Sequence, residues 1–351
     1  MSRNLERLLI ANRGEIAIRI ARSADEQGIQ TLAVYSLDDA ESRHRFTADD
    51  AAMLDGTGAA AYRDINCIIR IALDAGCDAI HPGYGFLSEN PELARQCEQN
   101  GLIFVGPRPE VLEVFGDKSL SRELAQRCAV PLVPGTPMLT SRAEASDFMQ
   151  TLDAPASIMI KAIAGGGGRG MRTVQDSSEL DEAVTQARRE ARAAFGDDRI
   201  YAERYLVGAR HVEVQIAGDG SGDAVSLGDR DCSIQRQRQK LVEIAPAPFL
   251  TPDTRDAMAD AAIRMASEVR FRGVATFEFL IDSKRTQNFY FLECNPRIQV
   301  EHTVTEEVTG LDLVSLQFHL ALGRNLAESG SIPPPSPQGF AVQSRVNLES
   351  V

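Results

Sequence analysis

The stretch IKAIAGGGGRGMRTV, residues 160–174, places four consecutive glycines four residues after Lys161 and between two apolar segments. The flanking segments 157–162 and 171–174 are rich in apolar and β-branched residues and are predicted to be strands. A Walker-type phosphate loop needs its lysine and hydroxyl after the glycines, at the start of a helix, so this stretch is not one. A linker seldom lies between two strands of one domain. Taken alone, the glycines are consistent with a phosphate-binding flap or with a flexible turn.

A second informative stretch, GVATFEFLIDSKRTQNFYFLECN (273–295), is predicted to be a hairpin with a polar turn. A turn centred between residues 285 and 286 places Glu278 directly opposite Glu293. Opposed carboxylates destabilise a sheet unless a cation lies between them, and oxygen ligands from Glu and Asn suit Mg²⁺. The alternative is one solvated glutamate in a different register. Simple alternation also assigns one face of the second strand to Phe289, Phe291, Glu293 and Asn295.

The segments on either side of this hairpin carry further charge. RDCSIQRQRQKLVEIAPAP (230–248) is polar and cationic, and PRIQVEH (296–302) follows the hairpin directly. A solvated basic face is the ordinary explanation for the first segment. A cluster of cations beside a carboxylate and an ATP–Mg²⁺ site also suits a small anionic co-substrate, from which the carboxylate would remove a proton as general base. The charged side chains concerned are Arg230, Arg236, Arg238, Lys240, Arg297 and Glu301.

The order of predicted elements indicates an α/β protein with several domains. Residues 7–36 read as strand, amphipathic helix and strand, and the pattern continues to about residue 115, which predicts a doubly wound parallel sheet. The first turn of this unit, NRGE, has one glycine where a dinucleotide fingerprint has three, which disfavours a dehydrogenase. Residues 206–325 are predicted to mix strands with two helices, near 252–269 and 311–323. SIPPPSPQG (331–339) is predicted to be a connector, and a new strand follows it.

Composition limits the class of protein. The formal net charge of −13 argues against a nucleic-acid or anionic membrane surface as the main partner. The chain contains no apolar run long enough to span a bilayer and no signal-peptide pattern at its start, so a cytoplasmic or organelle-matrix location is expected. The six cysteines form no CxxC pair and are expected to be buried, reduced thiols.

Several segments, taken in order, resemble the biotin carboxylase domain of biotin-dependent carboxylases, within the ATP-grasp fold. The matching stretches are IANRGEIAIRI, AIHPGYGFLSEN, GDKSLSRELA, IKAIAGGGGRGMR, RHVEVQI, RDCSIQRQRQK, GVATFEFL and ECNPRIQVEHTVTE, between residue 8 and about 310. The resemblance implies that ATP activates bicarbonate to carboxyphosphate, which then carboxylates carrier-linked biotin. It implies an N-terminal α/β domain (1–115), a connecting segment (116–135), a mobile glycine-rich lid (136–205), a catalytic domain (206–330) and the start of an incomplete mixed-sheet C-terminal domain (331–351).

The resemblance also implies roles for individual residues. ATP would be bound by Lys118, Lys161, Gly165, Gly166, Gly167, Gly168, Met171, Glu203, Arg204, Leu206, His211 and Gln235. Mg²⁺ or Mn²⁺ would be held by Glu278, Glu293 and Asn295. Bicarbonate would be bound by Lys240, Arg297, Gln299 and the amide of Val300, with Glu301 as its base. Arg345 would stabilise the biotin enolate, and Tyr84 would lie near the biotin ring.

The chain departs from the family pattern at a few positions. Arg204 replaces a usual lysine and Arg238 a frequent histidine, while Pro296 and Thr303 also differ from common choices. Family members continue beyond the region of Arg345, so the last strand is expected to be unpaired and to expose apolar surface. No biotinyl-lysine motif is present, so the carrier and the carboxyltransferase are expected on another segment or subunit. A homodimer is common in the family. The rival functions are another bicarbonate-phosphorylating ligase, such as half of a carbamoyl-phosphate synthetase, and a nucleotide-binding module without turnover.

Overall fold

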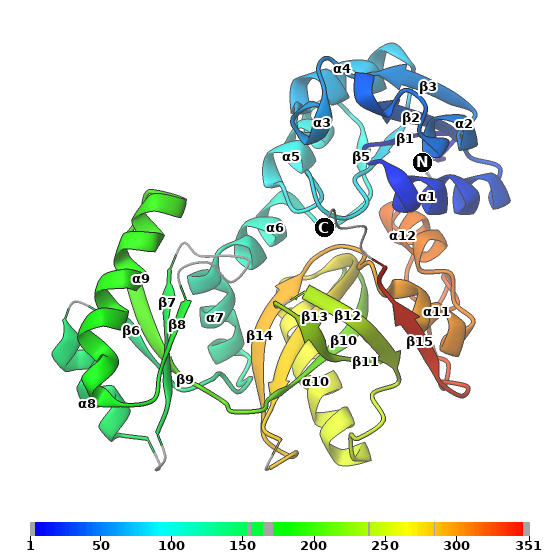
Figure 1. Ribbon diagram of the computed structural model, residues 1–351. Coiled ribbons are helices and arrows are strands. Elements are labelled where there is room, and N and C mark those ends of the chain that lie inside the picture. Colours follow the sequence, from blue (N-terminus) through cyan, green and yellow to red (C-terminus); the bar gives the residue numbers. More distant parts are fainter. Residues whose placement is uncertain are drawn as a thin grey trace.

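The computed structural model describes residues 4–139, 141–152, 156–163, 171–237, 239–283 and 285–346, apart from the side chain of Phe195. The predicted flap glycines at 165–168 and Arg238 lie outside these residues. The described strands form three sheets, each in its own lobe (Figure 1). The N-terminal lobe is blue and cyan, the small lobe is green, and the largest sheet lies beneath the N-terminal lobe in yellow and orange. This arrangement confirms the prediction of an α/β fold with several domains.

The N-terminal lobe is the predicted doubly wound domain. Its parallel sheet has the order β3-β2-β1-β4-β5, so the direction of winding reverses between β1 and β4. Apolar side chains from both faces of this sheet are buried against helices. The strands are β1 (Arg7–Ile10), β2 (Gln30–Tyr35), β3 (Asp50–Met53), β4 (Ala79–His81) and β5 (Ile103–Phe104). The helices are α1 (Gly14–Glu26), η1 (Leu37–Asp39), α2 (Arg43–Thr47), α3 (Gly58–Ala61), α4 (Ile65–Asp74), α5 (Pro91–Gln99) and α6 (Pro109–Gly116).

A helix leads from this lobe into the small green lobe. Helix α7 (Lys118–Arg127) is preceded by its N-cap residue, Asp117, whose side chain accepts hydrogen bonds from two backbone amides of the first turn. The small lobe has an antiparallel sheet of order β6-β9-β7-β8, with α8 and α9 packed on it (Figure 1). As predicted, strands flank the glycine run. The elements are β6 (Gly135–Leu139), α8 (Arg142–Gln150), β7 (Ile158–Ala162), β8 (Met171–Val174), η2 (Ser177–Glu179), α9 (Leu180–Phe195) and β9 (Ile200–Arg204).

The third lobe is built on a six-stranded antiparallel sheet of order β14-β13-β10-β11-β12-β15. One face carries a core of phenylalanines, among them Phe277, Phe279 and Phe291, packed against residues of α10. The strands are β10 (Arg210–Asp219), β11 (Ala224–Arg236), β12 (Gln239–Ala245), β13 (Arg272–Ile281), β14 (Phe289–Asn295) and β15 (Ala341–Ser344). The helices are α10 (Pro252–Glu268), α11 (His302–Thr309) and α12 (Leu313–Ala321).

The prediction of two helices in this region is wrong, because α11 is a third among the described residues. Its sequence HTVTEEVT is rich in β-branched residues, which have low intrinsic helix propensity. The helix nevertheless forms, because His302, Val304, Thr305 and Val308 are buried against the rest of the lobe. Tertiary packing therefore outweighs local propensity here.

The hairpin of β13 and β14 has the predicted pairing of Glu278 with Glu293, but reaches it differently. Near the turn, Phe279 pairs with Phe291, and a bulge then shifts the register by one residue before Glu293. A bulge of this kind puts one extra residue, here Leu292, into the strand. Consequently Phe289 and Phe291 face the apolar core, whereas Glu293 shares the opposite face with Glu278. The prediction that Phe289, Phe291 and Glu293 share a face is therefore wrong.

The last described strand also differs from expectation. β15 pairs with β12 along four residues, so the prediction of an unpaired strand is wrong. Exposed apolar side chains are present in this region, as expected, at Phe340, Val342 and Val346. The six cysteines are free thiols, five of them buried. Among the described residues, none of the helices has the length and apolar character required to cross a bilayer.

Candidate active site

A row of charged side chains crosses four neighbouring strands of the large sheet. Arg230 on β11 pairs with Glu213 on β10, Glu213 pairs with Glu278 on β13, and Glu278 pairs with Glu293 on β14. Alternating residues of β10 and β13, such as Val212 and Phe277, lie in the phenylalanine core. Because side chains alternate between faces, the charged residues project together from the other face of the sheet.

Lys240, on β12, connects this row to α11. Its Nζ donates to Glu213 at 2.6 Å, to Glu278 at 2.9 Å and to Glu301 at 2.7 Å. Burial alone would lower the pKa of Lys240, but the surrounding carboxylates outweigh it and raise the pKa well above its usual value. Lys240 is therefore a firmly charged ammonium shared by three carboxylates. The prediction grouped Lys240 with an anion site, and the structure places it at the centre of the cluster.

Glu213 and Arg230 form the most deeply buried part of the cluster, and both side chains are 0% exposed. The Arg230 guanidinium pairs through Nε with Glu213 and donates to Gln215 at 2.9 Å, Thr305 at 2.8 Å and Thr276 at 3.0 Å. Burial would raise the pKa of Glu213, yet Arg230 and Lys240 lower it to about 2. The sequence reading of Arg230 as one cation of a basic segment overlooked that it is buried and satisfied.

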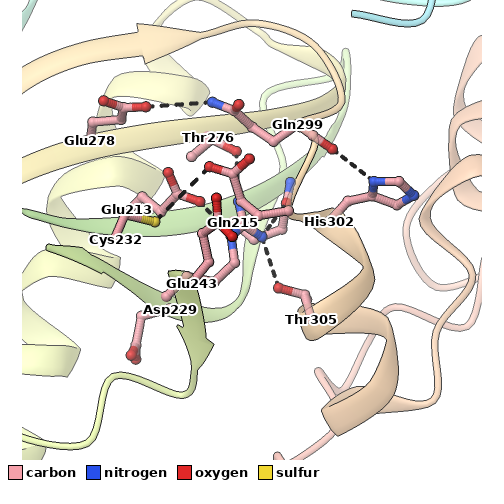
Figure 2. A network of polar contacts seen from close by, with 12 residues as sticks. Glu213, Gln215, Asp229, Cys232, Glu243, Thr276, Glu278, Gln299, His302 and Thr305 are labelled. Atoms are coloured by element: carbon pink, nitrogen blue, oxygen red, sulfur yellow. Dashed lines mark hydrogen bonds and ion pairs between the residues drawn. The ribbon is translucent and has the colours of Figure 1, made fainter. Parts of the chain in front are cut away.

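Glu301 lies at the N-cap of α11 and is fully buried. One carboxylate oxygen accepts from Lys240, and the other accepts from Arg345 Nη2 at 2.7 Å. The Arg345 Nε donates to Glu243 at 2.6 Å. Figure 2 shows Glu213, Gln215, Thr276, Glu278, Gln299 and Thr305 gathered from several strands and α11 into one polar network. The contacts with Lys240 and Arg345 fix the orientation of the Glu301 carboxylate, and a fixed orientation is one requirement for a general base that takes a proton from a bound anion.

The residues predicted to hold a metal lie together beside this network. Asn295 Nδ2 donates to Glu278 at 3.0 Å, and His211 Nε2 is 2.8 Å from the other Glu278 oxygen. Burial opposes ionisation of Glu278, but Lys240 and His211 lower its pKa to about 2. Glu293 behaves oppositely: desolvation and the Glu278 carboxylate raise its pKa, although its side chain remains partly exposed. Two opposed carboxylates and an amide oxygen fit Mg²⁺, which would relieve their repulsion.

Arg297 connects the site to the N-terminal lobe. Its Nε donates to Glu89 at 2.5 Å, its Nη2 donates to Asn295 at 3.0 Å and its Nη1 lies 3.3 Å from Gln299 Oε1. Gln299 is buried and lies 3.5 Å from Glu278. The hydroxyl of Tyr84, in the loop after β4, donates a hydrogen bond to the Glu15 carboxylate. Arg297, Gln299 and Val300 therefore lie together on the segment that links β14 to α11, whereas Tyr84 belongs to the N-terminal lobe.

The predicted nucleotide residues are distributed between the small lobe and the large sheet. Lys161 on β7 pairs with Glu203 on β9, which also accepts from Arg122 at 2.7 Å. Lys118 is exposed, yet partial desolvation lowers its pKa, and its charge interacts with Glu293, Lys161 and Glu203. Lys118 therefore lies between the small lobe and the predicted metal ligands. In the small lobe, Met171 is the first residue of β8 and Arg204 the last of β9, and Leu206 follows β9. On the large sheet, Gln235 Nε2 lies 2.9 Å from His211 Nδ1.

The charged residues that sequence reasoning missed include Glu213, Glu243, Glu89 and Arg122. Period-two alternation in HVEVQIAGD was a usable signal for Glu213, because it separates His211, Glu213 and Gln215 from apolar neighbours. Glu243 is one of two acids in the cationic segment, and nothing local distinguishes it from a solvated side chain. Glu89 and Arg122 reach their partners across 208 and 81 residues, so only the folded chain brings them together.

Comparisons with known proteins agree with this geometry. Family models match residues 4–112 (biotin carboxylase, N-terminal domain) and 117–329 (carbamoyl-phosphate synthase L chain, ATP binding domain). Pyruvate carboxylase of Aspergillus niger is 49% identical over 98% of this chain, and that of Bacillus subtilis is 46% identical over 99%. The chain spans 29% and 30% of the length of these two relatives.

Solved structures extend the likeness to the fold. The biotin carboxylase domain of Hydrogenobacter thermophilus 2-oxoglutarate carboxylase, a dimer in complex with MgADP, ADP and bicarbonate, is 42% identical with a TM-score of 0.89. The match covers 98% of this chain and 75% of that one. Campylobacter jejuni biotin carboxylase is 39% identical with a TM-score of 0.90, over 97% of this chain and 76% of that one. The chain therefore belongs to the biotin carboxylase family and has its ATP-grasp fold.

Proposed function

We propose that this chain carries out the ATP-dependent carboxylation of biotin by bicarbonate, the first half-reaction of a biotin-dependent carboxylase. The observation that carries the proposal is the buried Glu301, held at 2.7 Å by both Lys240 and Arg345 beside the Glu278–Glu293 pair. A solved relative of the same family binds MgADP and bicarbonate, and this chain retains the ionic groups that such ligands need. The final acceptor of the carboxyl group is chosen by a separate transferase.

The nucleotide would lie between the small lobe and the large sheet. Lys118 and Lys161 would neutralise phosphate oxygens, and Gly165, Gly166, Gly167 and Gly168 are proposed to bind ATP as well. Glu203, Arg204, Leu206 and Met171 would line the base and ribose pocket, with His211 and Gln235 near the phosphates. Glu278, Glu293 and Asn295 would hold Mg²⁺ or Mn²⁺, which polarises the transferred phosphoryl group when bound.

Bicarbonate would bind Arg297, Gln299 and the amide of Val300, on the segment entering α11. Glu301 would remove its proton as it attacks the terminal phosphate, giving carboxyphosphate and ADP. Arg345 would then stabilise the negative charge on the biotin ureido oxygen, and Tyr84 would contact the ring. Lys240 would hold the Glu301 carboxylate in place through its hydrogen bond at 2.7 Å.

The relatives support a proposal about the wider assembly. The pyruvate carboxylases that match this chain are far longer, since the chain spans only 29% and 30% of two of them. We infer that a biotin carrier and a carboxyltransferase accompany this domain, on the same polypeptide or on another subunit. The Hydrogenobacter domain is a dimer, and a homodimer is proposed for this chain as well. A cytoplasmic or organelle-matrix location remains part of the proposal.

Replacement of the proposed base tests the function. In wild-type protein, MgATP hydrolysis should require bicarbonate and should rise with added biotin. Glu301→Gln should lower this rate at least about 100-fold, because general bases contribute factors of that order. Glu307→Gln, on an exposed side of the same helix, serves as the matched control and should retain the wild-type rate.

Three results would contradict the proposal. Bicarbonate-dependent hydrolysis in Glu301→Gln at the wild-type rate would remove Glu301 as the base. MgATP binding without turnover would indicate a nucleotide-binding module. Hydrolysis that responds to bicarbonate but is indifferent to biotin would favour another bicarbonate-phosphorylating ligase.

A further inference from the structure

Glu243 is a buried carboxylate that the mechanism above does not use. It lies on β12, three residues after Lys240, and is 0% exposed. One oxygen accepts from Arg345 Nε at 2.6 Å, and the other has no hydrogen-bond partner among the described residues. Burial raises the pKa of this carboxyl despite the nearby arginine. Figure 2 includes Glu243 among the side chains of the polar network.

Arg345 spans two buried carboxylates. Its Nε donates to Glu243, and its Nη2 donates to Glu301 at 2.7 Å. Its backbone amide donates to the carbonyl of Leu241 at 2.9 Å, so β12 holds both the main chain and the side chain of Arg345. The Arg345 side chain as a whole is 26% exposed.

We propose that Glu243 is a positioning residue that fixes the guanidinium of Arg345 through Nε, so that its terminal nitrogens face the reacting carboxylate and the ureido oxygen of biotin. The inference deepens the proposed function and rests on it for the identity of the ligand. An arginine side chain has several rotatable bonds, and an edge strand offers it little packing. A charged acceptor at Nε removes most of this freedom before substrate arrives.

The alternative is that Glu243 merely fastens β15 to β12. Other contacts already do so: four residue pairs join the two strands, and Thr303 Oγ1 on α11 donates to Gln343 at 2.7 Å. β15 should therefore remain in place when Glu243 loses its charge. The Glu243 carboxylate is also 0% exposed, and one of its oxygens has no hydrogen-bond partner among the described residues. Burial of such a charge lowers the stability of the fold, so it is a poor means of joining two strands. These two observations favour a functional reason for the charge.

The test compares two rates in Glu243→Gln, which keeps the shape and one neutral acceptor. Biotin carboxylation should fall about tenfold, in keeping with the loss of a charge-assisted hydrogen bond. Bicarbonate-dependent ATP hydrolysis without biotin should change less than about threefold, so that the ratio of the two rates falls. In a double-mutant cycle, Glu243→Gln should have no further effect on carboxylation once Arg345→Lys is present.

Asp229→Asn is the matched control, since Asp229 is another buried carboxylate of this sheet that pairs with an arginine, Arg255, at 2.5 Å. It should lower the melting temperature without altering the ratio of the two rates. An unchanged ratio in Glu243→Gln, or additive effects of Glu243→Gln and Arg345→Lys, would overturn the proposal.

A readout independent of turnover separates this inference from the proposed function. In protein labelled with ¹⁵N-arginine, the Nε–H resonance of Arg345 is identified by its disappearance in Arg345→Lys. Glu243→Gln should shift this resonance and speed its exchange with solvent, whereas Asp229→Asn should not. If wild-type protein fails to carboxylate biotin, the proposed function fails, and this resonance still decides whether Glu243 fixes Arg345. An unmoved, equally protected resonance would refute the inference.

Discussion

At the scale of single residues, the site is a nearly balanced set of buried charges. Lys240, Arg230 and Arg345 oppose four buried carboxylates, at Glu213, Glu243, Glu278 and Glu301. Each cation contacts at least one carboxylate, so the cost of burying the charges is offset by close pairing. Glu293 faces Glu278, and its pKa is raised, whereas the pKa values of Glu213 and Glu278 are lowered to about 2.

Glu293→Gln should stabilise the metal-free protein and abolish its stabilisation by MgADP. Removal of the repulsion between the two carboxylates should add at most about 1 kcal/mol, because Glu293 is exposed and solvent screens the interaction. Because the folded-state pKa of Glu293 is raised, wild-type protein takes up this proton as the pH falls through that pKa. The advantage of the variant should therefore shrink in that window.

Melting temperatures measured from neutral pH down to the ordinary range of glutamate titration, with and without MgADP, check this prediction. Asp282→Asn, at the turn end of the same hairpin, serves as the control and should keep the response to MgADP. A Glu293→Gln protein that is less stable than wild type without metal would contradict the assignment of repulsion to this pair.

At the scale of elements, α11 depends on the sheet beneath it. Its sequence has poor helix propensity, and its buried Thr305 accepts a hydrogen bond from the fully buried Arg230 at 2.8 Å. The same helix carries Glu301 at its N-cap. The contact between Thr305 and Arg230 therefore fixes the helix that positions the proposed base.

Thr305→Val should lower the free energy of unfolding by about 1–3 kcal/mol, because it leaves a buried guanidinium N–H unsatisfied. It should also weaken bicarbonate-dependent ATP hydrolysis, since Glu301 loses its anchored helix. Thr305→Ser keeps the hydroxyl and should restore most of both quantities, apart from the loss of one methyl group. Urea denaturation and ATPase rates measure the two effects; equal destabilisation by Val and Ser would assign the cost to packing alone.

The elements also show what the sequence could predict. The βαβ pattern and the strands around the glycine run follow from periodicity. The pairing of Glu278 with Glu293 was predicted from a regular ladder and a turn centred between residues 285 and 286, whereas the structure reaches it through a different turn register and a bulge. Helix α11 was missed because its β-branched residues resemble a strand, and the bulge at Leu292 was missed because alternation alone assumes a regular ladder. Glu89, Arg122 and Glu243 were missed because their partners are distant in sequence, and spatial proximity leaves no local pattern.

At the scale of the whole molecule, the site lies where the lobes meet. Glu89, in the N-terminal lobe, accepts from Arg297 at 2.5 Å, and Arg19 on α1 pairs with Glu306 and Asp312 near α11 and α12. The first contact bears directly on the proposed bicarbonate site. We therefore expect the N-terminal lobe to contribute to catalysis by holding Arg297 in one orientation.

Glu89→Gln should raise the KM for bicarbonate about two- to fivefold and leave the KM for ATP unchanged. The effect is modest because Glu89 is 43% exposed and its ion pair is partly screened. High salt should reduce the difference between variant and wild type. Glu92→Gln, on α5 of the same lobe, is the control and should leave both constants unchanged. A lower KM for bicarbonate in Glu89→Gln would mean that Glu89 competes with the anion instead of orienting Arg297.

The charged row across β11, β10, β13 and β14 has a consequence for how the chain folds. A slip of one residue between two of these strands would move Glu213 or Glu278 into the space of Phe277 and Phe279. An unpaired carboxylate in that apolar core would cost several kcal/mol. This cost makes misaligned strand pairings less stable than the native one. The charged side chains of the proposed active site therefore also help to specify the register of the strands that carry them.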